Sequence, residues 1–105
     1  MLRFMQQKEA KNSKTLSEEW LLYILQCKGG TFYTGVTKDL KRRLKMHRLG
    51  KASKYTRTRR PLRLLYQEIC GTRTQALVRE CVVKALPRKK KVELIKKTRK
   101  SQHPK

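Results

Sequence analysis

The chain has 105 residues, which suits one small domain with a single modest core. Lys and Arg number 29 against 7 Asp and Glu, so the formal net charge is +22, and this excludes an acidic mimic. Hydrophobic residues make up 37% of the chain, and no run approaches the roughly 20 apolar residues that span a membrane. Polar residues already interrupt the first seven positions, at Arg3, Gln6 and Gln7, so the chain start lacks the apolar centre of a secretory signal. We therefore expect a protein that is neither secreted nor membrane-spanning.

The charge is concentrated in the part of the chain that we expect to fold. Residues 1–19 carry four basic and three acidic side chains, and residues 87–105 carry nine and one. The middle, residues 20–86, keeps sixteen basic side chains and three acidic ones, a net charge of +13. A folded domain with this charge repels itself unless a polyanion offsets it. The pattern favours a nucleic-acid partner over the alternatives, an acidic membrane surface or simple solubility.

The first expected element is a β-hairpin. Residues 1–18 are a polar leader that we expect to be flexible. Residues 20–25 form an aromatic and aliphatic run of strand length, residues 28–30 (Lys-Gly-Gly) are a turn signal, and residues 31–37 are rich in β-formers.

The length of the hairpin loop decides whether two tyrosines converge. A two-residue turn at Gly29-Gly30 would pair Gln26 with Tyr33 and send Tyr23 and Tyr33 to opposite faces. A three-residue loop would pair Leu25 with Tyr33 and place both tyrosines on one face. A shared function for the two side chains therefore requires the three-residue loop or a bulge.

A helix is predicted at residues 40–49, where Leu40 and Leu44 share a face. Thr37 or Asp39 can cap its start, and Gly50 ends it. Residues 51–60 are basic and polar without periodicity, and we expect a loop there.

The second half predicts one strand and two helices. Residues 62–70 form a strand after Pro61, and Thr72 or Thr74 caps a helix over about 75–86. A short helix at about 88–97 completes a domain that spans 19–97. The last eight residues, 98–105, are a basic tail that we expect to be flexible.

The expected order is β-β-α-β-α-α. This predicts an α/β (α+β) fold, a three-stranded, mainly antiparallel sheet flanked by helices. The three cysteines, Cys27, Cys70 and Cys81, lie in apolar runs at unequal spacings, so we expect three reduced, buried thiols. His47 and His103 complete no recognisable zinc ligand set with them.

Four short motifs in order resemble the GIY-YIG nuclease superfamily. Leu21-Leu22-Tyr23 and Tyr33-Thr34-Gly35 are similar to the paired tripeptides that name the superfamily. Residues 39–47 resemble the helix with its catalytic arginine, and Arg43 follows the second tyrosine by the expected ten residues. Residues 76–80 resemble the helix that supplies a metal-binding glutamate. The match covers about residues 20–97 and implies the superfamily's fold.

The segment 52–57, followed by Arg59-Arg60-Pro61, is similar to a small stand-alone, UPF0213-like branch of this superfamily. Two positions depart from the motifs: Leu21 stands in place of a glycine, and Thr34 in place of an isoleucine. Both are backbone or packing positions, so the departures leave the chemistry in place.

The resemblance implies hydrolysis of DNA phosphodiester bonds with one divalent cation, Mg²⁺ or Mn²⁺, held by Glu80. Tyr23 would accept a proton from the attacking water, with Tyr33 nearby, and a cation together with the positive field would favour its phenolate. Arg43 would stabilise the phosphate, and His47 could orient Tyr23 or assist the leaving group. No small-molecule cofactor is implied.

The expected nuclease is selective for DNA structure rather than sequence, because the short chain leaves no room for a targeting domain. Branched, nicked or single-stranded DNA in repair or recombination is the expected substrate, with a possible partner protein for targeting. The expected location is cytoplasmic, at the nucleoid of a prokaryote, or nuclear in a eukaryote. The alternatives are a binding module that keeps the fold without turnover and, less favoured, a ribosome-associated or RNA-binding protein.

Two clusters are predicted to bind nucleic acid without sequence preference. They are Lys54, Tyr55, Arg57, Arg59 and Arg60 in the expected loop, and Lys89, Lys90 and Lys91 in the last helix.

Each candidate also has an ordinary structural interpretation. The tyrosines suit a core, the basic side chains suit a solvated face, and Glu80 suits an i,i+4 pair with Lys84.

Overall fold

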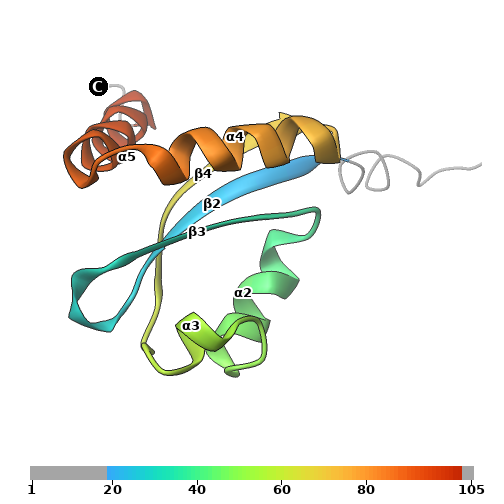
Figure 1. The fold of residues 1–105 in the computed structure, drawn as a ribbon, viewed down its shortest axis with the longest axis vertical. Helices are drawn as coiled ribbons and strands as arrows, with labels where there is room; N and C mark the ends of the chain where they lie inside the picture. Colours follow the sequence, from blue (N-terminus) through green and yellow to red (C-terminus); the bar gives the residue numbers. More distant parts are fainter. Residues whose placement is uncertain (1–18, 103–105) are drawn as a thin grey trace, which may run out of the picture.

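The computed structural model describes residues 19–102 and their side chains as far as Lys97, and the predicted leader lies outside this part of the chain (Figure 1). Its strands are β2 (Trp20–Gln26), β3 (Phe32–Thr37) and β4 (Arg63–Gly71). Its helices are α2 (Leu40–Arg48), α3 (Lys54–Arg57), α4 (Arg73–Ala85) and α5 (Arg88–Gln102), and a 3₁₀ turn, η1 (Lys28–Gly30), joins the first two strands.

The three strands form one antiparallel sheet in the order β3-β2-β4. Helices α4 and α5 lie over one face of this sheet, and α2 and α3 lie on the other side (Figure 1). The predicted α+β class and the antiparallel, three-stranded sheet are confirmed.

The apolar core lies between the sheet and the α4/α5 layer. Leu22 and Ile24 of β2 are fully buried and pack with Tyr66 of β4, Val83 of α4 and Ile95 of α5. Burial of each such aliphatic side chain contributes about 1.5–3 kcal/mol to folding. Because strand side chains alternate, Tyr23 between Leu22 and Ile24 points to the opposite face, towards α2.

Both open capping alternatives are resolved by hydrogen bonds. Asp39 caps α2 by accepting from the Arg42 N–H at 3.1 Å, while Thr37 Oγ1 accepts from the Asp39 N–H. Thr72 caps α4 in a reciprocal box with Gln75, so the helix begins at Arg73, two residues before the expected start.

The prediction of a loop at residues 51–60 is wrong, because α3 lies within it. Ser53 caps this one-turn helix by accepting the Thr56 N–H at 3.1 Å. Four residues are too few for an apolar periodicity, so the sequence carried no helical signal there. Helix α5 runs to Gln102, five residues beyond its expected end.

The prediction of three buried thiols is also partly wrong. Cys27 is buried, Cys70 is half-buried and Cys81 is exposed on α4, and all three are free. Cys81 lies in an apolar run, but a helix turns only part of such a run towards the sheet. Among residues 19–102 no helix is long and apolar enough to cross a membrane.

Candidate active site

The site begins with the register of the β2–β3 hairpin. Residues 28–30 form a three-residue loop, Leu25 pairs with Tyr33, and Tyr23 pairs with Gly35. Tyr23 and Tyr33 therefore share a face, with ring centroids 6.4 Å apart. The three-residue loop that a shared tyrosine function requires is confirmed.

Gly35 makes room for the phenol of Tyr23. A Cβ atom at position 35 would lie 2.6 Å from the Tyr23 hydroxyl oxygen and 2.7 Å from Cζ, closer than real Cβ contacts come. The glycine of the second tripeptide is thus required by the close approach of the Tyr23 ring to the β3 backbone.

His47 lies beneath the two tyrosines. It is the last inward-facing residue of α2, after the half-buried Leu40 and Leu44 on the same face, and only 1% of it is exposed. Its Nε2 is 2.9 Å from the Tyr23 hydroxyl, and its Nδ1 is 2.9 Å from the hydroxyl of Thr56 in α3. His47 therefore connects the strand that carries Tyr23 to the short helix.

Burial controls the protonation of this pair. Burial, then Tyr33, and more weakly Glu80 raise the pKa of Tyr23 above its ordinary value, and only Arg43 lowers it. The expected shift towards the phenolate is therefore wrong for the protein alone, because removal from water outweighs the positive field. Burial and the neighbouring Arg43 lower the pKa of His47 to about 4, so its imidazole is neutral near pH 7.

Arg43 and Glu80 approach Tyr23 from different layers. Arg43 is exposed on α2, one turn before His47, and Glu80 lies on α4, which packs against all three strands. Both charges act on the pKa of Tyr23, so both lie within electrostatic range of its hydroxyl. The structure joins Tyr23 and His47 by a hydrogen bond, and Arg43 and Glu80 act on Tyr23 through their charges.

Glu80 also has the ordinary partner that its spacing predicts. Its carboxylate forms an ion pair with Lys84 Nζ at 3.3 Å. The Glu80 side chain is 18% exposed, and the Lys84 side chain is 57% exposed. The exposed lysine can move away into water, whereas the carboxylate lies in a mostly buried position.

The other two acidic residues between positions 20 and 86, Asp39 and Glu68, have structural roles. Asp39 caps α2. Glu68 binds Arg79 through two hydrogen bonds, at 2.7 and 3.2 Å, and accepts the hydroxyl of Tyr66. Arg79 and Tyr66 hold the pKa of Glu68 below its ordinary value although burial raises it.

The ring of Tyr55 is not a free stacking platform. One side of it stacks on Tyr33, with centroids 6.0 Å apart, and the Arg59 guanidinium lies 3.8 Å from its centre. Arg59 also donates to the Tyr55 carbonyl at 2.9 Å. Tyr55 keeps about a third of its surface exposed, at 36%, beside these contacts.

Arg60 joins two helix ends. Its guanidinium donates to the carbonyls of Arg48, at the end of α2, and Arg57, at the end of α3. Cations stabilise the carbonyl ends of helices, so Arg60 holds α3 against α2. Lys54 and Arg57 are exposed on α3, as a nucleic-acid contact requires.

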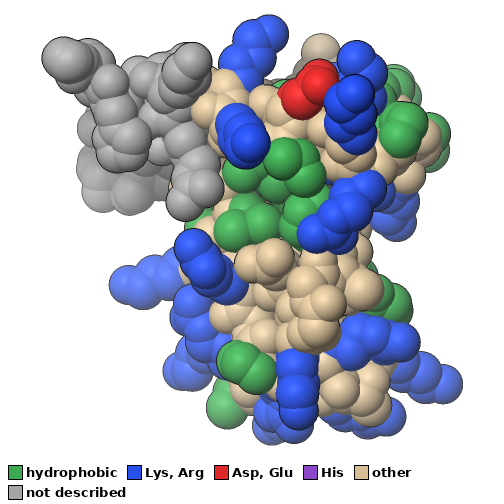
Figure 2. Space-filling view, turned by 90° about the vertical axis from the view of Figure 1, so that its left-hand side faces the viewer, with side chains coloured by type: hydrophobic (Ala, Val, Ile, Leu, Met, Phe, Trp, Pro, Cys, Tyr) green, Lys and Arg blue, Asp and Glu red, His purple; other side chains and the backbone are tan. Residues whose placement is uncertain are grey.

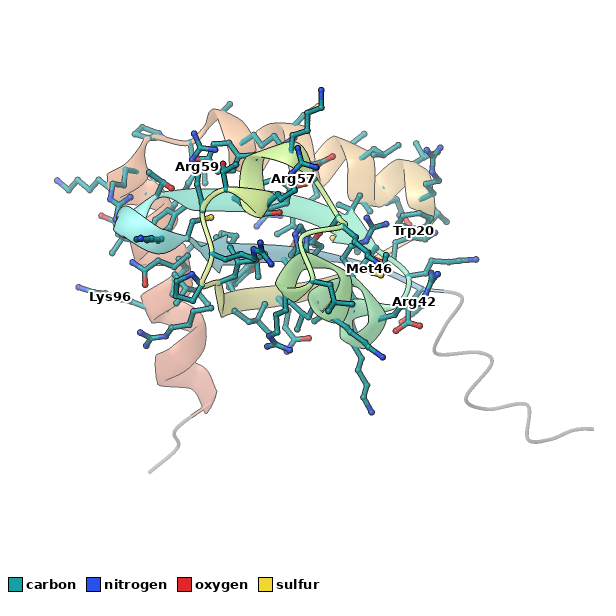
Figure 3. All side chains as sticks on the ribbon, turned by 90° about the horizontal axis from the view of Figure 1, so that it is seen from below. Trp20, Arg42, Met46, Arg57, Arg59 and Lys96 are labelled. Atoms are coloured by element: carbon teal, nitrogen blue, oxygen red, sulfur yellow. The ribbon has the colours of Figure 1, made fainter. Side chains whose placement is uncertain are left out.

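The structure does not bring the second predicted cluster to this face. Lys89, Lys90 and Lys91 begin α5, which packs with α4 on the other layer. Seen from the α2/α3 side, Arg57 and Arg59 lie in front of the sheet, whereas Lys96 of α5 lies off to one side (Figure 3).

Positive charge is high on the α2/α3 side of the sheet, where the two tyrosines point. Residues 38–60, which carry α2 and α3, hold eleven Lys and Arg against one acid, Asp39. Residues 61–86 hold four against two. In Figure 2, Lys and Arg side chains continue to the lower, α2/α3 end, and acidic side chains are visible only near the upper end.

Sequence reasoning did not identify Ser53 and Thr56. Thr56 is fully buried, and its hydroxyl lies 2.9 Å from both His47 Nδ1 and the Ser53 hydroxyl. The spacing Ser-x-x-Thr is a capping signal, but nothing in it indicates that the threonine reaches α2.

Comparison with known families agrees with this arrangement. A family model described as the GIY-YIG catalytic domain matches residues 19–101. The chain therefore belongs to the GIY-YIG family, a class of nuclease domains.

Relatives within this class carry the name UPF0213. A UPF0213 protein of Staphylococcus saprophyticus is 46% identical over 74 residues, covering 70% of this chain and 90% of that protein. One of Staphylococcus aureus is 45% identical over 75 residues, covering 71% and 92%. The solution structure of a UPF0213 protein from Bacillus halodurans shares 44% identity over 74% of this chain and 83% of that chain, with a TM-score of 0.49.

Proposed function

We propose that this protein is a metal-dependent endonuclease that hydrolyses DNA phosphodiester bonds on the α2/α3 side of its sheet. One observation carries the proposal. A buried tyrosine hydrogen-bonded to a neutral histidine lies within electrostatic reach of one arginine and one glutamate, on a strongly basic side of the sheet.

Tyr23 and His47 act together on the attacking water. The raised pKa of Tyr23 makes the isolated phenol a weak source of phenolate, so a second acceptor must take up its proton. His47 Nε2, 2.9 Å away and on a neutral ring, is positioned for this.

Arg43 binds the scissile phosphate. Arg43 is exposed and lies one helical turn before His47. Its charge lowers the pKa of Tyr23, although burial outweighs this effect. A planar guanidinium donates two parallel hydrogen bonds to a pair of phosphate oxygens and stabilises the charge that develops there. The predicted contribution of Arg43 is therefore to turnover more than to affinity.

Glu80 fits a single divalent cation. Its oxygens are of the type that Mg²⁺ and Mn²⁺ prefer, and it is mostly buried and held by one exposed lysine. Among the described residues no three His, Cys, Asp or Glu side chains cluster. Glu80 would therefore hold the cation as a single protein carboxylate. When bound, the cation supplies Lewis-acid stabilisation of the phosphate charge.

The substrate we propose is DNA of unusual structure rather than defined sequence. Exposed side chains of α2 and α3 are almost all lysine and arginine, which contact phosphates and carry no base-specific information. Branched, nicked or single-stranded DNA in repair or recombination, at the nucleoid, is the corresponding context. A partner protein would then supply any targeting.

A second candidate is a binding module without turnover. The Glu80–Lys84 ion pair supports it, because a carboxylate held by lysine is not free for a cation. The two candidates differ in one measurable property, which is cleavage.

The test is incubation of labelled duplex, single-stranded, flap and four-way-junction DNA with Mg²⁺ or Mn²⁺, for wild type and Tyr23→Phe. We expect cuts by the wild type alone, which stop when the metal is chelated. Because Phe keeps the ring that packs on Gly35, the variant isolates the hydroxyl. Tight binding without cuts in either protein would support the binding module, and equal cutting by both would contradict the role of Tyr23.

A further inference from the structure

The hydrogen bonds of Tyr23 and His47 continue to α3. The His47 ring contacts Thr56 Oγ1, and Thr56 Oγ1 in turn contacts Ser53. Thr56 is fully buried and His47 is 1% exposed. Buried polar atoms without access to water need hydrogen-bond partners within the protein. The donors and acceptors along this series of hydrogen bonds can therefore be counted to assign the protons.

Two arrangements satisfy the distances. In the first, Tyr23 donates to His47 Nε2, and the proton on Nδ1 is donated to Thr56. In the second, every bond runs the other way, from Thr56 to Nδ1 and from Nε2 to Tyr23. A neutral imidazole has one N–H and one bare nitrogen, so only one arrangement exists at a time.

The partners of Thr56 favour the first arrangement. Once it accepts from His47, Thr56 Oγ1 has two acceptors for its own proton, the Ser53 hydroxyl at 2.9 Å and the Ser53 carbonyl at 3.5 Å. The phenol is also a stronger acid than a neutral imidazole N–H, so it is the better donor of the two. We propose that Thr56 is a positioning residue that keeps the His47 proton on Nδ1 and leaves Nε2 bare towards Tyr23.

This assignment gives the proposed nuclease its proton acceptor, and its catalytic consequence rests on that proposed function. As the water oxygen bonds to phosphorus, the scissile P–O bond breaks and the departing oxygen takes a proton from solvent. The proton lost by the water bonds to Tyr23 Oη, while the original Oη–H bond breaks and an Nε2–H bond forms. The resulting imidazolium donates from Nε2 to Tyr23 and from Nδ1 to Thr56. The Thr56 hydroxyl therefore keeps the same orientation whether His47 is neutral or protonated. In the opposite tautomer, Nε2 carries the proton and cannot accept one from Tyr23.

The surroundings of α3 hold Thr56 in place. Arg60 bridges the Arg57 and Arg48 carbonyls, and the Lys28 N–H of the hairpin loop donates to the Arg59 carbonyl at 2.8 Å. A one-turn helix has little stability of its own, so these contacts from α2 and the hairpin fix it. They give this short element a purpose that its sequence did not reveal.

The test compares Thr56→Val, which removes the hydroxyl, with Thr56→Ser, which restores it. Thr34→Val is the matched control, because Thr34 is a buried threonine on the opposite face of the sheet, at a position where the family motif carries isoleucine. Cleavage of the best substrate gives kcat and KM for each. Nitrogen-15 NMR of the free proteins identifies the protonated ring nitrogen, and His47→Gln separates the signals of His47 from those of His103.

We expect a wild-type spectrum with His47 protonated at Nδ1. Thr56→Val should lower kcat by about 10- to 100-fold at unchanged KM, as loss of a positioning partner does, and should give a mixed tautomer. Thr56→Ser should recover both properties, and Thr34→Val should match the wild type in kcat.

Protonation at Nε2 in the wild type overturns the proposal, even if Thr56→Val fails to fold. Equal kcat in Thr56→Val and wild type also overturns it. If the wild type cleaves nothing, the proposed function fails, and the spectrum still decides whether Thr56 sets the tautomer.

Discussion

The two faces of the sheet are built from different kinds of contact. The α4/α5 face is an apolar core, in which Leu22 and Ile24 pack with side chains from three other elements. The α2/α3 face buries polar groups instead, and Tyr23, His47 and Thr56 are satisfied by one another. Along β2, Leu22 and Ile24 thus stabilise the core, whereas Tyr23 between them belongs to the candidate active site.

The difference teaches how a small basic domain can hold reactive groups. The α2/α3 side combines these buried polar groups with eleven basic side chains between residues 38 and 60. Glu80 acts on Tyr23 from the α4/α5 layer instead.

Arg43→Ala should remove a contact made most strongly with the charged transition state. We expect kcat to fall by about 10²–10³ with little change in KM. Arg42→Ala is the matched control, since Arg42 is the neighbouring exposed arginine on the same helix and it contacts Asp39 through its backbone. Single-turnover cleavage measures both, and equal losses in kcat would reduce Arg43 to an ordinary phosphate contact.

Ile24→Ala and Tyr23→Phe compare the two faces at adjacent positions. Ile24→Ala should lower the free energy of unfolding by about 3 kcal/mol, because it leaves a cavity in the core. It should keep kcat at temperatures where the variant is folded. Tyr23→Phe should lose cleavage and change stability by only about 1 kcal/mol. Denaturant unfolding and cleavage assays measure the two properties, and similar profiles for both variants would contradict the division.

The lowered pKa of His47 predicts an acid-sensitive fold. An unfolded histidine titrates near 6.5, so between that pH and about 4 the unfolded state binds a proton that the native state does not. Stability should therefore fall by on the order of 2 kcal/mol as the pH drops from 6.5 to 4. His47→Gln should flatten this part of the curve in denaturant titrations, and an unchanged slope would show that another group causes it.

Salt dependence compares the basic surfaces. Each phosphate contact that is lost lowers the slope of log affinity against log salt by about 0.9 for duplex DNA. We expect Lys41→Ser with Lys45→Ser on α2 to lower it more, per lysine, than replacement of Lys89, Lys90 and Lys91 by serine on α5. A larger effect at α5 would place the DNA on the other layer.

The sequence was sufficient for features that depend on local periodicity. Strand alternation reduced the question of whether Tyr23 and Tyr33 share a face to the length of one hairpin loop, and helical spacing placed Arg43 one turn from His47. The motif order identified the family. Each of these features depends on residues close together in the chain.

Features that depend on distant contacts were not predictable. Helix α3 is held by hydrogen bonds from α2 and from the hairpin loop, so its four residues show no pattern of their own. The effect of burial on the pKa of Tyr23 in the protein without a cation was not foreseen, because burial is a property of the packed structure. The contacts of the Tyr55 ring with Tyr33 and Arg59 were not predicted for the same reason.

Glu80 is proposed to hold the cation that cleavage requires, whereas Glu68 stabilises the fold through Arg79 and Tyr66. Single-turnover cleavage of the best DNA substrate in Mg²⁺ should be compared for wild type, Glu80→Gln and Glu68→Gln. We predict a loss of at least about a hundredfold for Glu80→Gln at unchanged or improved affinity, since the variant removes a negative charge from the interface. Glu68→Gln should cleave at the wild-type rate while unfolding more easily. Wild-type cleavage by Glu80→Gln would contradict the account.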